Sequence, residues 1–213
     1  MEDYKVCILA GGIGSRMDNF TRYFNKAMLP LQGKPIISYI IEKIPENIEA
    51  VVAIGYMGDS LREYVRTAHP EQRLSFVEVD RYTGHGTGPG YGLLKCKNSL
   101  QCPFVVSAVD TLVLEDVPEP NENWFGVARV LDTGRFCSAK VSNDRVTRID
   151  DKVKTDNEFA FIGLAGIKDH EIFWNALESN QHTIGGEIQL SNGLISLIER
   201  GLYARVFTWF DVG

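Results

Sequence analysis

Short apolar runs alternate with amphipathic stretches along the first half of the chain. The runs have the length and β-branched composition of buried strands, and the stretches between them space their apolar side chains as helices do. The predicted strands are residues 5–9, 50–54, 74–79 and 103–109, and the predicted helices are residues 35–44 and 59–66. This alternation predicts an α/β fold whose sheet is mostly parallel and has helices on both faces.

The pattern changes after a polar, proline-rich stretch at residues 118–123. Shorter strands separated by turn residues follow, and then two helical patterns and a closing strand. The predicted strands here are residues 125–130, 138–141, 145–149, 159–167 and 203–208, and the predicted helices are residues 170–176 and 187–200. We expect these strands to form a small mixed sheet over a cleft, within a single domain of residues 1–213 that has no linker between its halves.

A glycine-rich turn follows the first predicted strand directly. It reads Leu9-Ala10-Gly11-Gly12-Ile13-Gly14-Ser15-Arg16. Glycine lets the backbone approach a ligand closely, and successive N–H groups in such a turn form a concavity that binds anions. Arg16 and, ten residues further on, Lys26 add two cations suited to phosphate oxygens. The pattern predicts a cradle for a polyphosphate, although strand-to-helix turns also use glycine for structural reasons alone.

Two familiar phosphate-binding motifs are absent from the sequence. There is no GxxxxGK[ST] pattern, which excludes a P-loop. Met17 stands where the dinucleotide fingerprint needs its third glycine. A dinucleotide-binding oxidoreductase is therefore disfavoured.

Two further stretches carry candidate site residues near the ends of predicted strands. Residues 83–92 contain five glycines and lead into an apolar segment, as a loop that opens a helix would; a mobile connector is the alternative. Asp110 ends the most apolar strand, where a carboxylate needs a cation or a donor nearby. A magnesium ion held on substrate phosphates would supply that cation, and a turn cap is the alternative role.

The pattern L-A-G-G-x-G-S-R-M followed by N-K-A-M-L-P-L-x-G-K-P resembles the signature of the nucleotidyltransferases that make nucleotide-activated sugars and related phospho-compounds. Further matches lie near residues 84–94, 104–111, 151–152 and 209–213. The resemblance implies a Rossmann-like, GT-A-like fold. It also implies that residues 1–117 form a nucleotide-binding half and residues 118–213 an acceptor-binding half.

The resemblance also implies a role for each matching residue. Arg16 and Lys26 correspond to the catalytic cations, and Asp110 and Asp211 to the ligands of Mg²⁺, although Val109 replaces the glycine that usually precedes the first aspartate. The nucleotide-binding positions are Leu9, Ala10, Gly11, Gly12, Gly14, Ser15, Gly86 and Thr87. The acceptor-binding positions are Lys152, Gly166 and Glu187, and Lys154 is an alternative to Lys152.

The acceptor is the least determined part of this interpretation. Sugar-1-phosphate transferases usually have an aromatic-Gly pair and an Asn-x-Gly element, where this chain has Phe136-Cys137 and Leu164-Ala165-Gly166. These departures favour a phospho-alcohol such as phosphocholine, with CTP as donor. An aromatic cage for its ammonium group could come from Tyr82, Tyr91, Trp174 and Trp209. A sugar 1-phosphate giving an NDP-sugar remains the leading expectation, and an inactive nucleotide-binding regulatory module is the alternative of another class.

Composition and charge narrow the range of possible binding partners. A net charge of −6 argues against broad binding to nucleic acid or to an anionic membrane. The four cysteines lack metal-type spacing, no apolar run reaches the roughly 20 residues of a membrane span, and no signal peptide is visible. We expect a cytoplasmic enzyme that binds an NTP and a small phosphorylated acceptor. A homo-oligomer is compatible with the sequence, and the W-x-D-x-G ending resembles an interrupted motif, which predicts further residues beyond Gly213.

Overall fold

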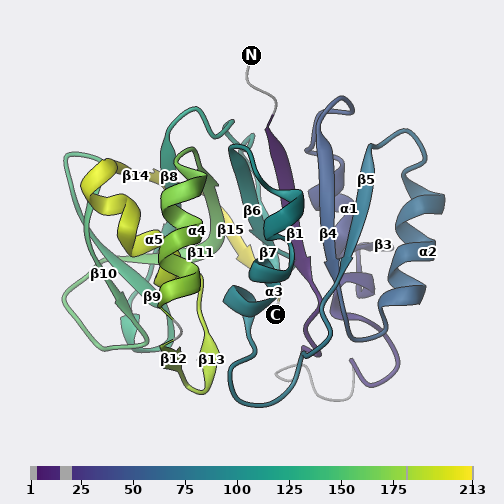
Figure 1. The fold of residues 1–213 in the computed structure, drawn as a ribbon, viewed down its shortest axis with the longest axis horizontal. Coiled ribbons are helices and arrows are strands. Elements are labelled where there is room, and N and C mark those ends of the chain that lie inside the picture. Colours follow the sequence, from purple (N-terminus) through teal and green to yellow (C-terminus); the bar gives the residue numbers. More distant parts are fainter. Residues whose placement is uncertain (1–3, 15–20, 181, 213) are drawn as a thin grey trace.

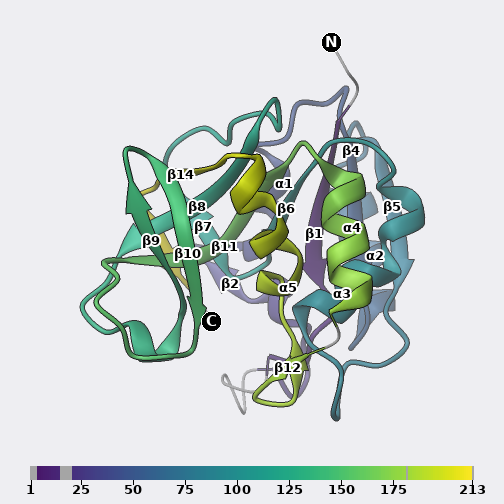
Figure 2. The same ribbon diagram turned by 60° about the vertical axis from the view of Figure 1, so that its left-hand side comes forward.

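A computed structural model describes residues 4–14, 21–180 and 182–212. Its main feature is a nine-stranded sheet in the order β5-β4-β1-β6-β11-β8-β14-β10-β9, with helices on both faces (Figures 1 and 2). The strands of this sheet are β1 (Lys5–Ala10), β4 (Glu49–Ile54), β5 (Leu74–Glu78), β6 (Phe104–Ala108), β8 (Asn123–Arg129), β9 (Cys137–Ser142), β10 (Arg145–Asp151), β11 (Phe159–Ile167) and β14 (Leu202–Val206). The helices are α1 (Ile36–Ile41), α2 (Gly58–Ala68), α3 (Pro89–Lys95), α4 (His170–Ser179) and α5 (Ser191–Leu194).

The first half of the chain builds a parallel sheet around β1. This strand pairs in parallel with β4 on one side and with β6 on the other, and β4 continues the sheet to β5. Because β1, β4 and β6 run in the same direction, their carboxyl ends meet at one edge of the sheet. The glycine turn after β1 and Asp110 after β6 therefore lie at the same edge, as the fold class predicted.

The second half of the chain extends the same sheet with mixed pairing. β11 is antiparallel to β6 and to β8, β14 runs parallel to β8, and β10 is antiparallel to β14 and β9. The α/β class is thus confirmed, and the mixed strands are continuous with the parallel ones. The separate small sheets among the described residues are two-stranded: β2 (Pro30–Leu31) with β3 (Lys34–Pro35), β7 (Thr111–Val113) with β15 (Trp209–Asp211), and β12 (Thr183–Ile184) with β13 (Glu187–Ile188).

Alternating side chains along the strands pack into two cores, one on each face of the sheet. Val6 and Ile8 of β1 face the layer of α1 and α2, which contributes residues such as Ile37 and Leu61. Cys7 points the opposite way, into a core with α3 and α4 in which Phe104, Phe173 and Trp174 make ring contacts. Figures 1 and 2 show α3, α4 and α5 together on one face of the sheet. Burial on both faces explains why the strand reads as a continuous apolar run rather than an alternating one.

The helix predicted over residues 187–200 is wrong at its start. Glu187 and Ile188 form β13 instead, and the helical part is the short α5 followed by a 3₁₀ segment, Ile195–Arg200. The apolar residues at 188, 190 and 194 match a helical face, but Gly185 and Gly186 both have positive φ and turn the chain into a hairpin ahead of them. Local turn chemistry decided the conformation here.

The model also bears on membrane association. Across residues 4–14, 21–180 and 182–212, none of the helices combines the length and the apolar character that crossing a bilayer requires.

Candidate active site

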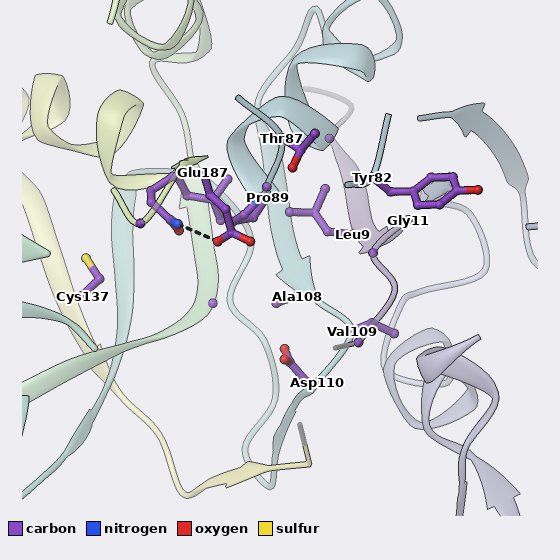
Figure 3. A pocket seen from close by; sticks show the side chains of 18 of the residues that line it. Leu9, Gly11, Tyr82, Thr87, Pro89, Ala108, Val109, Asp110, Cys137 and Glu187 are labelled. Atoms are coloured by element: carbon purple, nitrogen blue, oxygen red, sulfur yellow. Dashed lines mark hydrogen bonds between the residues drawn. The ribbon is translucent and has the colours of Figure 1, made fainter. Parts of the chain in front are cut away.

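A cavity of about 960 Å³ lies at the carboxyl edge of the parallel strands. Its wall includes the glycine turn after β1, the loop before α3, the end of β6, the middle of β11, the turn that follows β10, and the β12–β13 hairpin. Figure 3 shows Leu9, Gly11, Thr87 and Tyr82 on one side of it, Cys137 on the other, and Asp110 between them. Ligands of open α/β sheets bind at this edge, so the cavity is where the fold class places a site.

The glycine turn is held by close backbone contacts. A Cβ on Gly55 would lie 2.5 Å from the carbonyl oxygen of Gly11, and Tyr56 N–H donates to that oxygen at 3.1 Å. Gly14 has φ +66°, and a Cβ there would lie 2.9 Å from Thr21 Cγ2 and 3.2 Å from Lys26 Cβ. Leu9, Ala10, Gly11, Gly12 and Gly14 all line the cavity. The glycines of the predicted turn thus line the cavity, and a side chain at Gly14 would collide with Thr21 and Lys26.

Asn25 ties this turn to the next one, a role that the sequence interpretation missed. Its side-chain amide donates to Ala10 O at 3.0 Å and to Tyr56 O at 2.6 Å, and its carbonyl oxygen accepts from Ala27 N at 2.9 Å. Asn25 is 2% exposed, so these bonds are shielded from water. An Asn directly before Lys26 at the start of a 3₁₀ turn was the available signal, because Asn commonly caps such turns.

Lys26 and Asp110 form an ion pair at the centre of the cavity wall. Lys26 Nζ lies 2.7 Å from Asp110 Oδ2, and the two side chains are 12% and 30% exposed. The ammonium group satisfies the need of a carboxylate at the end of a buried strand for a nearby cation. The two predicted residues are therefore brought together across 84 positions of sequence.

Asp211 is delivered to the same place by a short antiparallel ladder. β15 pairs with β7 so that Asp211 stands opposite Thr111, and Val212 N–H donates to Asp110 O at 3.1 Å. Asp110 and Asp211 both line the cavity. The described residues contain no cluster of three or more His, Cys, Asp or Glu that could hold a metal by themselves. Two carboxylates suit Mg²⁺, which typically takes one or two carboxylates and completes its shell with water and substrate phosphates.

The loop before α3 and the β12–β13 hairpin are joined to each other. Gly86 N–H donates to Gly186 O at 2.8 Å, Ile188 N–H donates to Thr87 O at 2.7 Å, and His85 and Thr183 form a side-chain hydrogen bond of 3.3 Å. Thr87 is 4% exposed and lines the cavity. Gly86 donates its N–H to the hairpin and is not among the lining residues. The predicted Gly-Thr pair thus divides into one residue that lines the cavity and one that anchors the loop.

Two of the three predicted acceptor-binding residues line the cavity. Lys152 Nζ lies 3.9 Å from Glu187 Oε2, and Gln189 Nε2 donates to the same Glu187 oxygen at 3.0 Å (Figure 3). Lys152 has φ +55°, an uncommon conformation for a residue with a side chain that is found preferentially at functional sites. Lys154, the alternative to Lys152, is not among the lining residues.

The placement of Gly166 corrects its predicted role. This residue is buried in β11 and does not line the cavity, and a Cβ there would lie 2.0 Å from Trp124 Nε1. This position has to be glycine because any side chain would collide with the indole ring of Trp124. Gly163, three residues earlier in the same strand, does line the cavity and has φ +79°.

The end of the cavity formed by the second half carries further polar groups, and the sequence interpretation did not predict the contacts between them. Asp151 stands opposite Cys137 in the β9–β10 pairing, and Ser191 Oγ donates to Asp151 Oδ2 at 2.6 Å. Burial and the charges of Asp151 and Asp150 raise the pKa of the Cys137 thiol well above its usual value. The thiol is therefore neutral at physiological pH and is no candidate nucleophile.

The four aromatic residues considered for an ammonium cage do not converge. Trp174 is 2% exposed and donates to Leu100 O from the core, and Tyr91 donates from its hydroxyl to Asp80 Oδ1 at 2.6 Å. That bond and Lys95 hold the pKa of Asp80 at about 2. Tyr82 and Trp209 line the cavity, and Trp209 makes an edge contact with Phe136. Phe136 and Phe161 are lining residues that the sequence interpretation did not include in a cage.

Ser15 and Arg16 lie outside the described residues, so their predicted phosphate contacts stay predictions. They directly follow Gly14, which lines the cavity.

The fold and this edge-of-sheet cavity define the class of protein: a nucleotidyltransferase-type α/β domain. The family model of the MobA-like NTP transferase domain matches residues 6–117, which is more than half of the chain. The chain belongs to this family of nucleotidyltransferases.

Curated relatives match along nearly the whole chain. The bifunctional protein GlmU of Methanococcus maripaludis is 27% identical over 214 residues, covering 97% of this chain and 50% of that protein. GlmU of Methanocaldococcus jannaschii is 27% identical over 215 residues, with the same coverage of each. The chain thus spans about half the length of the curated relatives it matches.

Solved structures share the fold at low sequence identity. A UDP-glucose pyrophosphorylase in complex with UDP-glucose superposes with a TM-score of 0.80 at 18% identity, covering 99% of this chain and 93% of that one. The CTP:phosphocholine cytidylyltransferase of Streptococcus pneumoniae superposes with a TM-score of 0.72 at 18% identity, covering 96% and 90%. These likenesses establish the architecture of both halves of the chain.

Proposed function

We propose that this chain transfers a nucleotidyl group from an NTP to a phosphate-monoester acceptor, with release of pyrophosphate, and that the acceptor is a sugar 1-phosphate. The observation that carries the proposal is the meeting of the glycine turn, the Lys26–Asp110 pair and Asp211 in the middle of one cavity. One end of that cavity has the backbone of a polyphosphate cradle. The other has room and polar groups for a second substrate.

The reaction is an in-line attack of an acceptor phosphate oxygen on the α-phosphorus of the NTP. The new bond joins that oxygen to the α-phosphorus, and the bond from the α-phosphorus to the bridging oxygen of the β-phosphate breaks, so that pyrophosphate leaves. A phosphate monoester has its second pKa near about 6, so the nucleophile is already mostly ionised at pH 7. No general base is required, which fits the neutral Cys137 thiol and the structural role of His85.

The protein's task is alignment and neutralisation of charge. The backbone amides of residues 11–14 and Arg16 would hold the β- and γ-phosphates. Lys26, released from Asp110 or shared with it, would lie between the α-phosphate and the incoming phosphate. Its pairing partner and its low exposure keep the ammonium group at one place before substrate arrives.

Asp110 and Asp211 would hold Mg²⁺ when the nucleotide is bound. The metal would supply charge neutralisation at the α-phosphate. The donor set fits, because the β7–β15 ladder brings the backbones of the two aspartates together, both residues line the cavity, and two carboxylates would leave the remaining positions to water and substrate oxygens.

The similar proteins favour a sugar phosphate as acceptor, since one of the solved structures that share the fold is a UDP-glucose pyrophosphorylase in complex with UDP-glucose. A phospho-alcohol with CTP is the second candidate. It is favoured by the rings of Phe136, Phe161 and Trp209 at the acceptor end, and by the absence of the aromatic-Gly pair.

The test is pyrophosphate release from each of the four common NTPs, paired with a panel of sugar 1-phosphates and phospho-alcohols in the presence of Mg²⁺. Turnover with one pairing identifies reaction, base and acceptor together. Silence across the panel contradicts the proposal and favours a nucleotide-binding module. Such a module would still show a rise in melting temperature on adding Mg²⁺ only when nucleotide is present.

A further inference from the structure

Two arginines line the cavity, and they differ in how their charge is engaged. Arg81 donates from Nε to the Tyr91 hydroxyl at 3.2 Å and stacks on that ring at 4.6 Å. Arg135 makes no hydrogen bond, ion pair or ring contact with any residue that the structure describes. A permanently charged, planar group with five donors is therefore presented at the cavity, and none of the residues 4–14, 21–180 and 182–212 accepts from it.

The backbone that carries Arg135 is firmly fixed. Arg135 ends a 3₁₀ turn, Thr133–Arg135, in which the Asp132 side chain accepts from Gly134 N at 3.0 Å. Thr133 is 3% exposed and exchanges hydrogen bonds with Thr155, its hydroxyl accepting from Thr155 N at 2.9 Å. Arg135 itself is exposed at the end of this turn. The turn thus fixes the backbone from which the guanidinium reaches the rim of the cavity.

Backbone pairing places Arg135 at the acceptor end. Lys152 N–H donates to Phe136 O at 2.9 Å, and Asp151 stands opposite Cys137. Arg135 therefore precedes a segment paired with the one that carries Lys152. Figure 3 shows Cys137 on the side of the cavity away from Leu9 and Gly11, with Asp110 between. On the proposed function the phosphate that attacks the NTP would lie beside Lys26 and Asp110, so a cation at the other end of the cavity would meet another part of the acceptor.

The charges at this end explain why an anion is the fitting ligand. Asp151 already accepts from Ser191, and Glu187 accepts from Gln189 and lies 3.9 Å from Lys152. The lining carboxylates are thus engaged by partners, whereas Arg135 is not. A neutral hydroxyl would use only some of the N–H donors of the Arg135 guanidinium. A carboxylate or a phosphate matches the guanidinium with two parallel hydrogen bonds.

We propose that Arg135 is a specificity-determining residue that binds a second anionic group on the acceptor, so that the preferred acceptor is a sugar phosphate bearing a carboxylate or another phosphate besides the one that reacts. The proposal rests on the proposed function and goes beyond it by naming the class of sugar. It accounts for a cation at the acceptor rim of a chain whose net charge is −6.

The experiment compares hexose 1-phosphates that differ only at C6: the hydroxymethyl sugar, the uronic acid and the 6-phosphate, in the gluco, galacto and manno series. Wild-type protein is expected to show kcat/KM at least about 10-fold higher with one of the anionic acceptors than with its neutral counterpart. Arg135→Gln is expected to lower that value about 10- to 100-fold, the range for losing a hydrogen bond to a charged group, chiefly through KM. It should change turnover of the neutral sugar less than about 3-fold.

Arg129→Gln is the matched control, because it removes one exposed guanidinium, paired with Glu158, from the second half of the chain at a residue that does not line the cavity. It should leave the preference unchanged, and a loss equal to that of Arg135→Gln would assign the effect to general charge and overturn the proposal. Preference of the wild type for neutral sugars or for phosphocholine, with no effect of Arg135→Gln, would overturn it while leaving nucleotidyl transfer intact. Absence of turnover with every acceptor would refute the proposed function, and this proposal with it.

Discussion

The two halves of this molecule build their shares of the cavity in different ways. The first half uses mainly backbone: the glycine turn after β1, the loop before α3, and one buried amide, Asn25, that joins the turns. The second half uses side chains from strands and a hairpin, such as Lys152, Glu187 and Arg135. Backbone that must approach a ligand demands glycine at fixed spacing, whereas side chains on a sheet can be exchanged without disturbing the fold.

The comparison indicates where specificity can vary. On the proposed function, the parts of the first half that would hold the polyphosphate would do the same task for any NTP, so we expect them to tolerate little change. The end of the cavity that we propose for the acceptor has Cys137 in its wall, a packed Gly166 outside the cavity, and at its rim Arg135, whose side chain has no partner in the part of the chain that the structure describes. We infer that the first half sets the reaction and that the second half sets the acceptor.

The largest effect should come from Lys26→Ala. Removal of a preorganised cation at the reacting phosphates is expected to lower kcat about 10²-fold or more, whichever acceptor is used. Pyrophosphate release measures it, and Lys34→Ala, which removes an exposed ammonium paired with Glu42, is the control. Near-normal turnover of a folded Lys26→Ala protein would break the comparison, because the first half would then not carry the chemistry.

The second prediction concerns Asn25, whose side chain makes three hydrogen bonds at 2% exposure. Asn25→Ala leaves the carbonyl groups of Ala10 and Tyr56 without that donor, which is expected to cost about 2–3 kcal/mol of unfolding free energy. For a chain of this size the melting temperature should fall by roughly 5–10 °C. A calorimetric scan measures this. An unchanged melting temperature would show that water replaces the amide and that the turns are held by other contacts.

Sequence reasoning was most successful where geometry restricts residue choice. The edge of the sheet at which the cavity lies was predictable, and so were the positions of the glycine turn and Asp110 at that edge. Parallel strands have their carboxyl ends at one edge, and only glycine fits a position such as Gly14. Lys26 and Asp110 were each predicted, but their ion pair was not, because 84 residues separate them. Arg135 and the Asp151–Ser191 bond were missed for the same reason: their meaning depends on the β9–β10 register and the hairpin, which carry no local signal.

Two glycines test the division between packing and binding. A Cβ on Gly166 would lie 2.0 Å from Trp124 Nε1, so Gly166→Ala is expected to destabilise the fold by about 2 kcal/mol through overpacking. Gly12 lines the cavity, and a Cβ there would meet nothing within 4 Å. Gly12→Ala should therefore keep stability within about 0.5 kcal/mol of wild type and raise KM for the NTP instead. Denaturant unfolding with parallel kinetics measures both, and the opposite pattern would return Gly166 to the acceptor site.

The smallest expected effect is a change of stability with pH. It tests the helical layer of the first half and not the cavity. His69 follows α2 and bonds to Ser38, which also contacts the Tyr64 hydroxyl. Burial lowers the pKa of His69; the Glu42 carboxylate opposes this and the Lys34 ammonium adds to it. Because the unfolded chain then binds the proton more readily than the folded one, His69 favours folding above the unfolded pKa of about 6.5 and loses that contribution as pH falls below it.

Unfolding free energies of the wild type and of His69→Gln should consequently converge as pH is lowered from 8 to 5.5. Stability is the appropriate readout, because the acceptor phosphate itself titrates near about 6 and would obscure the effect in any activity profile. A difference that stays constant over this range would mean that His69 titrates alike in both states. A difference that grows on acidification would mean that the Glu42 carboxylate outweighs burial and holds the imidazolium in place.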